Sequence, residues 1–124
     1  MKEIVVAITG ASGAIYAGRL LKALLSGGHT VHLVLSKFGR LLLHEELGFK
    51  PDRESIREFL VRLYGEEIDK GQIHEYAVGD QSSIIASGSA DIDGMIIVPC
   101  SIKTLSGVAN GYANNLVDRF KNEL

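Results

Sequence analysis

Three short turns in the sequence combine glycine, serine and threonine in a way that suits binding of a phosphate. They are residues 9–13 (TGASG), residues 36–37 (SK) and residues 99–104 (PCSIKT), and each follows an apolar run and opens a helical pattern. The start of a helix presents unpaired backbone N–H groups and the positive end of the helix dipole. Small side chains let the backbone approach a ligand, and hydroxyl groups add hydrogen-bond donors. These turns therefore predict an anion site.

The first turn has two other interpretations when it is taken alone. A tight connection between a strand and a helix would explain its two glycines. A dinucleotide fingerprint would also explain them, but Ile15 and Tyr16 stand where its third glycine is expected. An NAD site further requires an acidic residue at the end of the second strand, where this chain has Ser36 and Lys37. A serine and a lysine favour a mononucleotide, with NADP as the alternative.

Apolar runs alternate with helical patterns, and this alternation places the three turns at one edge of a sheet. Strands are expected over residues 4–9, 31–35 and 94–99. A strand followed by a helix and another strand forms a right-handed crossover in a parallel sheet. Ligands bind such sheets beyond the carboxyl ends of the strands. Because the three turns follow those ends, we expect them to converge.

Helical periodicity predicts the elements between the strands. A second helix over residues 36–47 is expected to turn Phe38, Leu41 and Leu42 toward the core. A third helix is expected to begin at an N-cap residue, Asp52. The remaining expectations are a first helix ending at residues 27–28, a charged turn over residues 65–71, a short strand over residues 73–78, a loop over residues 81–90 and a helix over residues 102–114.

Composition limits the class of protein. The 124 residues fit one domain spanning residues 1–124, and 13 basic against 15 acidic residues give no concentrated basic surface for nucleic acid. The apolar runs are too short to span a membrane, and no secretory leader precedes the first strand. We therefore expect a cytoplasmic protein that binds neither nucleic acid nor membrane. A single cysteine, Cys100, and four scattered histidines predict no disulfide and no metal site.

Five motifs carry a more specific signal. They are residues 9–16 (TGASGAIY), 35–37 (LSK), 86–89 (ASGS), 99–107 (PCSIKTLSG) and 114–119 (NNLVDR). In order and approximate spacing they resemble the flavin prenyltransferase family (UbiX/Pad-type, formerly called aromatic acid decarboxylases). A chance match to one motif is easy, whereas a joint match to five is strong evidence.

The resemblance implies an α/β fold, a flavodoxin-like or Rossmann-like parallel sheet with helices on both faces. It also implies transfer of a dimethylallyl group from dimethylallyl phosphate to reduced FMN, by a homo-oligomer whose product serves a UbiD-type decarboxylase. It assigns the prenyl substrate to Ser87, Gly88 and Arg119, of which Arg119 suits the leaving phosphate. It assigns FMN binding to Gly10, Ala11, Ser12, Ser36, Ser101, Ile102, Lys103 and Thr104.

Ser12 and Glu46 are the expected catalytic residues. The resemblance aligns Glu46 with an acidic residue implicated in proton handling. The flavin must lose protons at N5 and C6, which makes a relay through Ser12 and Glu46 reasonable. The alternative for Glu46 is a solvated helix carboxylate beside Glu45. Lys103 could equally contribute only its backbone, and Cys100 is expected to be a packed thiol.

Three rival functions stay open at this point. One is an FMN-dependent cysteine decarboxylase relative, but residues 99–104 favour the prenyltransferase branch, because those decarboxylases typically carry an Ala-Asn-type motif there. A second is a non-catalytic FMN-binding fragment, since the chain ends before the family's C-terminal third. We expect this ending to weaken prenyl transfer. A third is a short NADP-dependent reductase.

Overall fold

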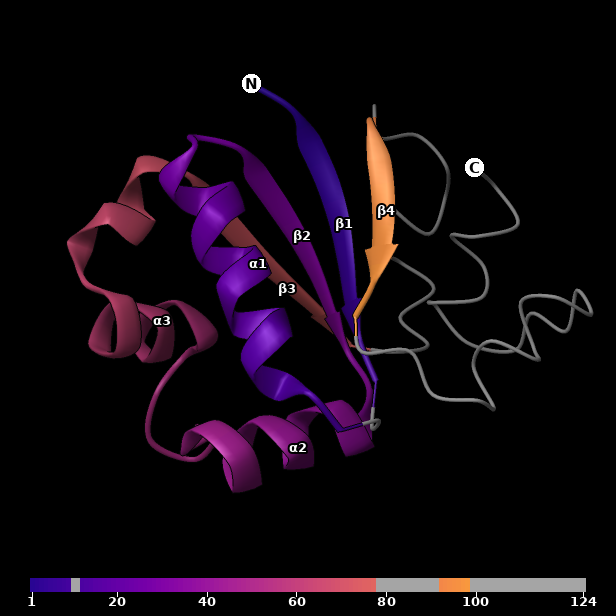
Figure 1. Ribbon diagram of the computed structural model, residues 1–124, viewed down its shortest axis with the longest axis vertical. Helices are drawn as coiled ribbons and strands as arrows, with labels where there is room; N and C mark the ends of the chain where they lie inside the picture. Colours follow the sequence, from indigo (N-terminus) through magenta and orange to yellow (C-terminus); the bar gives the residue numbers. More distant parts are fainter. Residues whose placement is uncertain (10–11, 78–91, 99–124) are drawn as a thin grey trace, which may run out of the picture.

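The computed structural model describes residues 1–9, 12–77 and 92–98, and their centre is a parallel sheet. Its strand order is β3-β2-β1-β4 (Figure 1). The chain moves outward from β1 to β3 and then returns to the other side of β1 to form β4, so the strand order reverses between β1 and β4. The strands are β1 (Glu3–Ile8), β2 (Thr30–Leu35), β3 (Gln72–Ala77) and β4 (Gly94–Ile97).

The strands end almost level with one another at the carboxyl edge of the sheet. Ile8 pairs with Leu35, which pairs with Ala77, and Ala7 pairs with Ile97. This register brings the turns after β1 and β2 together, as expected from the sequence. The third turn, residues 99–104, lies outside the described residues.

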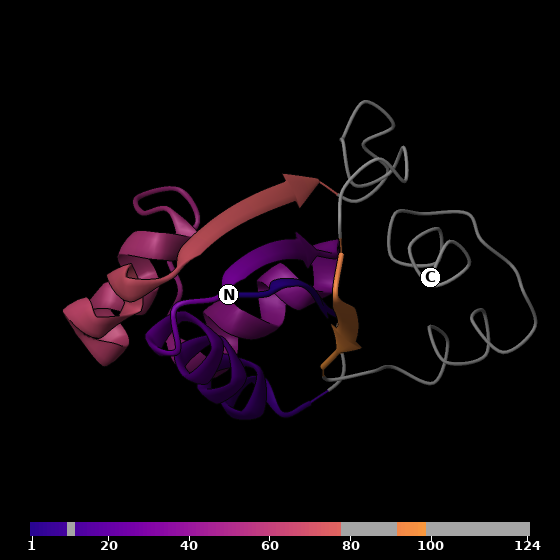
Figure 2. The same ribbon diagram turned by 90° about the horizontal axis from the view of Figure 1, so that it is seen from above.

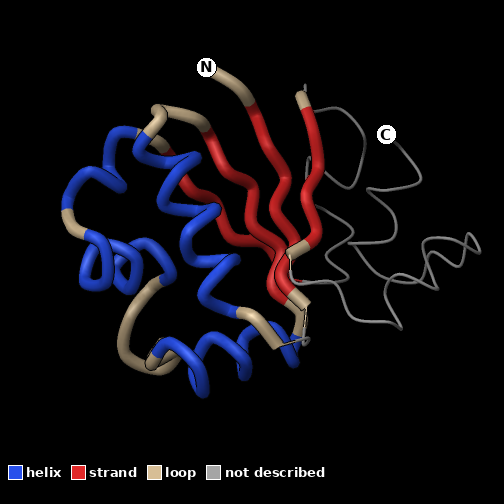
Figure 3. The backbone as a smooth tube through the Cα atoms, viewed as in Figure 1, coloured by secondary structure: helices blue, strands red, loops and turns tan. Residues whose placement is uncertain are grey.

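The helices of the described residues cover one face of the sheet (Figures 1 and 2). In Figure 3 they form the blue layer beside the red strands, and α1 runs roughly along the strands next to β2. The loop expected over residues 81–90 and the helix expected over residues 102–114 lie outside the described residues. The helices are α1 (Ala14–Ser26), α2 (Lys37–Leu47), α3 (Ile56–Tyr64) and the 3₁₀ helix η1 (Glu66–Lys70).

Both faces of β1 are buried, which explains its almost unbroken apolar sequence. Val6 and Ile8 pack into the core beneath the helices. Val5 and Ala7 point to the opposite face, where they form a smaller apolar cluster with Val34. All these β1 side chains are fully buried. The alternation of side chains along a strand therefore lets β1 serve two cores at once.

The predicted core face of α2 was partly wrong. Phe38 and Leu41 were expected inside, yet they are 66% and 47% exposed, whereas Leu42 is buried as expected. The cause is Gly39, which lies so close to the sheet that a Cβ atom there would be 2.2 Å from the carbonyl oxygen of Ile8. This contact fixes the rotation of α2, so that the inward stripe is Gly39, Leu42 and Leu43.

The predicted N-cap of α3 was also wrong. Ser55, not Asp52, caps the helix, and its hydroxyl accepts a hydrogen bond from the backbone N–H of Glu58 at 3.1 Å. The Glu58 carboxylate accepts one in return from the backbone N–H of Ser55 at 2.9 Å. This reciprocal pair is a capping box. It starts the helix three residues later than the Asp52 prediction.

Candidate functional site

Ser36 fixes the start of α2 at the carboxyl end of β1. Its Oγ accepts a hydrogen bond from the backbone N–H of Gly39 at 2.9 Å, as an N-cap does. The same hydroxyl donates to the carbonyl oxygen of Ile8 at 3.3 Å, and the backbone N–H of Ser36 donates to that carbonyl at 3.1 Å. The second predicted turn is therefore joined directly to the end of the strand that leads into the first.

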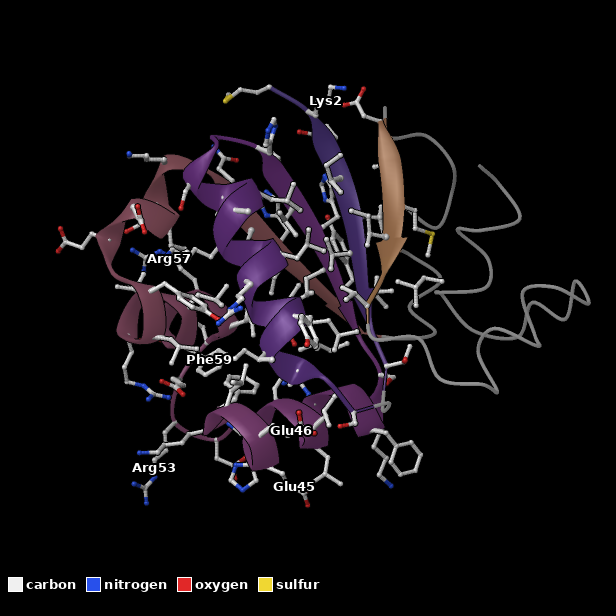
Figure 4. All side chains as sticks on the ribbon, viewed as in Figure 1. Lys2, Glu45, Glu46, Arg53, Arg57 and Phe59 are labelled. Carbon is white, nitrogen blue, oxygen red and sulfur yellow. The ribbon has the colours of Figure 1, made fainter. Side chains whose placement is uncertain are left out.

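Glu46, in the last turn of α2, lies against the start of α1 (Figure 4). Its Oε1 accepts hydrogen bonds from the backbone N–H groups of Gly13 at 3.3 Å and Ala14 at 3.0 Å. Its Oε2 lies 3.5 Å from the hydroxyl of Ser12, which donates to it. Both carboxylate oxygens are thus engaged by the first predicted turn.

These contacts exclude the second interpretation of Glu46, a solvated carboxylate, and leave its catalytic role a prediction. The side chain is exposed, but it is not merely a solvated carboxylate, because it caps another helix. Its contact with Ser12 is at the long limit for an O–H···O hydrogen bond, while its contact with Ala14 has ordinary length. The geometry therefore joins Ser12 to Glu46 and makes helix capping the stronger of the two interactions.

Three of the predicted site residues lie at the carboxyl edge of the sheet: Ser12 and Glu46, which are in contact, and Ser36, at the opposite end of α2 from Glu46. They come from the turn after β1 and from the two ends of α2. This is the edge where a ligand is expected, next to the position at which the strand order reverses. The other predicted site residues lie outside the described residues: Gly10, Ala11, Ser87, Gly88, Ser101, Ile102, Lys103, Thr104 and Arg119.

Exposed apolar side chains lie at the start of α1 and of α2. Ile15 and Tyr16 are 44% and 66% exposed, and Phe38 and Leu41 on α2 are also exposed. Sequence periodicity had assigned the α2 pair to the core, so this feature was missed. The useful signal was Gly39, since a glycine within a helix often marks close approach of another backbone.

Neither a metal centre nor a membrane-spanning helix is present in the part of the chain that the structure describes. Its His, Cys, Asp and Glu side chains form no group of three or more that could hold a metal ion. None of its helices is long and apolar enough to cross a membrane.

A family model described as Flavoprotein matches residues 1–124. The chain belongs to the flavoprotein family. Membership favours a flavin over the NADP alternative. The fold agrees, because the parallel α/β sheet resembles solved relatives and confirms the expected flavodoxin-like fold class.

Two curated relatives are named as flavin prenyltransferases. The "Probable UbiX-like flavin prenyltransferase" of Bacillus subtilis (strain 168) is 36% identical over 117 residues, which cover 94% of this chain and 50% of the relative. "Flavin prenyltransferase UbiX" of Alkalihalophilus pseudofirmus is 40% identical over 118 residues, covering 95% of this chain and 57% of the relative. The flavoprotein chain thus spans about half the length of the curated relatives it matches.

Two solved structures share the fold. AnUbiX (PadA1), in complex with FMN and dimethylallyl pyrophosphate, has a TM-score of 0.77 and 32% identity, covering 98% of this chain and 57% of the other. The dodecameric FMN-dependent UbiX-like decarboxylase from Escherichia coli O157:H7 has a TM-score of 0.76 and 35% identity, covering 98% and 59%. The likeness extends over nearly the whole of this flavoprotein chain.

Proposed function

We propose that this chain provides the FMN-binding part of a flavin prenyltransferase, which transfers a dimethylallyl group from dimethylallyl phosphate to reduced FMN. The observation that carries the proposal is the contact of Ser12 with Glu46 at the carboxyl edge of the sheet, where Ser36 opens α2. The likeness to flavin prenyltransferases over nearly the whole chain supports the assignment.

The residues at this edge fit a flavin mononucleotide. Ser36 opens α2, whose positive dipole end suits the FMN phosphate, and the exposed Lys37 adds a cation beside it. The exposed side chains of Ile15, Tyr16 and Phe38 offer apolar surface for an aromatic ring system. Reduced FMN, when bound, supplies the N5 and C6 positions that accept the prenyl group.

Ser12 and Glu46 would remove the protons that leave the flavin. The Ser12 hydroxyl donates to Glu46, so it can accept a proton from the flavin while passing its own to the carboxylate. Glu46 is exposed and can return that proton to water. The backbone N–H groups of Gly13 and Ala14 hold the carboxylate in place between turnovers.

The remaining assignments belong to the whole protein. Gly10, Ala11 and residues 101–104 would complete the flavin site. Ser87, Gly88 and Arg119 would hold dimethylallyl phosphate. The enzyme would act as a homo-oligomer in the cytoplasm, and its prenylated FMN would serve a UbiD-type decarboxylase.

A second candidate is FMN binding without turnover. The observation in its favour is that Glu46 is held more closely by the backbone N–H of Ala14, at 3.0 Å, than by the Ser12 hydroxyl, at 3.5 Å. In that case the carboxylate would only cap α1, while the edge formed by Ser12 and Ser36 would still hold the flavin.

One experiment separates the two candidates. The purified protein is mixed anaerobically with FMN, dithionite and dimethylallyl phosphate, and the flavin is analysed by mass spectrometry. The prenylated adduct is expected if the chain is a prenyltransferase, and it should be greatly reduced in Ser12→Ala and in Glu46→Gln. Unmodified bound FMN would favour the second candidate. Failure to retain any FMN would refute both.

A further inference from the structure

The three α-helices of the described residues begin in two different ways. α2 and α3 each have a serine N-cap, Ser36 and Ser55, whose own hydroxyl accepts the backbone N–H of the third helical residue. α1 begins after Gly13, which has no side chain and adopts a left-handed conformation with φ of 113°. Its cap comes instead from a different helix, as the carboxylate of Glu46.

The position that Glu46 occupies is one that a phosphate would otherwise suit. Free N–H groups and the positive dipole end at a helix start attract an anion. In dinucleotide-binding sheets the glycine-rich turn after the first strand presents this helix start to the pyrophosphate. Here Glu46 Oε1 already accepts from the first two N–H groups of that start, at 3.3 and 3.0 Å.

Glu46 is held there by the way α2 is anchored. The first turn of α2 is fixed to Ile8 through Ser36 and through the close backbone contact of Gly39. Arg40 forms an ion pair with Glu75 on β3. At the other end, His44 Nδ1 is hydrogen-bonded to the carbonyl oxygen of Phe49 at 2.7 Å. A helix fixed at both ends keeps the carboxylate of its last turn in one place.

We propose that Glu46 is a built-in anion that closes the start of α1 to phosphate and pyrophosphate. Glu46 is thereby a specificity-determining residue, which excludes a dinucleotide at the glycine-rich turn and leaves the flavin phosphate to bind at another turn. That the flavin phosphate binds at another turn rests on the proposed function. The exclusion of phosphate from the start of α1 depends only on the contacts of Glu46.

The test measures binding of inorganic pyrophosphate to the wild-type protein and to three variants. Glu46→Ala removes the carboxylate and leaves space, and Glu46→Gln removes the charge but keeps an oxygen that can accept the N–H groups. Glu45→Ala is the matched control, because Glu45 is exposed on the same helix and points away from α1 (Figure 4). Affinities come from calorimetry, and the backbone amide signals of Gly13 and Ala14 report where the anion binds.

Glu46→Ala is expected to bind pyrophosphate about tenfold more tightly than the wild type, with both amide signals shifting. Glu46→Gln should show a smaller gain in the same signals, and Glu45→Ala should match the wild type. Equal affinity in wild type and Glu46→Gln would overturn the proposal, even if Glu46→Ala failed to fold. Movement of the Gly13 and Ala14 amides in the wild type would overturn it as well. If the wild type did not bind FMN, that result would refute the proposed function and leave the exclusion of phosphate untouched.

Discussion

Glu3 of β1 and His32 of β2 form a hydrogen bond of 2.8 Å on the face of the sheet opposite the helices. His32 is only 7% exposed. Its other ring nitrogen lies 3.1 Å from the hydroxyl of Tyr76 on β3, and its ring stacks on that of His74. A polar chain therefore joins three neighbouring strands beside an otherwise apolar cluster.

The hydrogen bond between Glu3 and His32 predicts a pH dependence of stability. The hydrogen bond from His32 holds the pKa of Glu3 below its ordinary value of 4.5. A lowered pKa in the folded state stabilises the protein at pH values above 4.5, and this contribution is lost as the pH falls through the folded-state value. The free energy of unfolding of Glu3→Gln should therefore be lower than that of the wild type at neutral pH and converge with it in acid.

Denaturant titrations at a series of pH values measure that difference. Glu66→Gln, an exposed carboxylate on η1, serves as the control for loss of one negative charge. A gap between wild type and Glu3→Gln that stayed constant down to the acid-unfolding range would contradict the coupling. Other carboxylates contribute to acid unfolding, since ion pairs with Arg62 and Arg57 lower the pKa values of Glu54 and Asp69. The difference between the wild type and Glu3→Gln therefore reports only the contribution of the Glu3–His32 pair.

Gly39 gives a second prediction, because its replacement cannot be accommodated without moving α2. In Gly39→Ala the new Cβ would lie 2.2 Å from the Ile8 carbonyl oxygen and 2.8 Å from the carbonyl carbon. Overpacking against backbone should cost about 2–3 kcal/mol of stability. It should also weaken FMN binding, since Ser36 and Glu46 are carried on the helix that must move.

Gly48→Ala is the matched control for this change. Gly48 ends α2 with φ of 78°, and nothing lies within 4 Å of a Cβ placed there. Its substitution strains the backbone by about 1 kcal/mol without a collision. Thermal unfolding should show a larger loss of stability for Gly39→Ala than for Gly48→Ala. FMN titration should show a loss of affinity in Gly39→Ala alone. Equal effects of the two substitutions on FMN would contradict the anchoring role of Gly39.

Local sequence patterns predicted the sheet well and the helix orientations less well. The apolar runs of β1 and β2 were located correctly because each strand is buried on both faces, which demands continuous hydrophobicity. The predicted inward face of α2 was partly wrong because Phe38 and Leu41 fit an apolar stripe, whereas the contact of Gly39 with Ile8 sets the rotation of the helix. Close backbone packing at Gly39 is a tertiary contact that periodicity does not encode.

In the candidate site, too, some features were predictable from local sequence and others depend on tertiary contacts. Ser12 and Ser36 lie in the turns after two neighbouring strands, so their place at one edge of the sheet was predictable. The pairing of Ser12 with Glu46 was expected only through the family resemblance, since 34 residues separate them. That Glu46 caps α1 could not be predicted, because it depends on how α2 lies against α1 in space.

Phe38 provides a test of the corrected orientation of α2. Because the side chain is 66% exposed, Phe38→Ser should change the free energy of unfolding by no more than about 0.5 kcal/mol. Phe59, on α3, is 1% exposed and packs on Phe49 with ring centroids 5.0 Å apart. Phe59→Ala should therefore cost about 3–5 kcal/mol. Chemical denaturation of both variants checks the contrast, which would disappear if Phe38 were a core residue.

The last prediction separates the structural role of Ser36 from its proposed role in FMN binding. Ser36 and Ser55 are both N-caps whose hydroxyl accepts a backbone N–H, at 2.9 Å and 3.1 Å. Ser36→Ala and Ser55→Ala should each lose about 1 kcal/mol of stability, because each removes one cap. Only Ser36 lies at the carboxyl edge beside Ile8, so only Ser36→Ala should weaken FMN binding.

Fluorescence titration of FMN, run beside thermal unfolding, measures both quantities on the same samples. A loss of FMN affinity in Ser36→Ala that Ser55→Ala does not share would place the Ser36 hydroxyl in the flavin site, because the loss of a cap is common to both variants whereas the hydrogen bond to Ile8 and any contact with the ligand belong to Ser36. If both variants bound FMN as the wild type does, the flavin phosphate and ribityl chain would have to lie elsewhere on this edge. Glu46 would still close the start of α1 to the flavin phosphate. The turn after β4 would then be the next position to test.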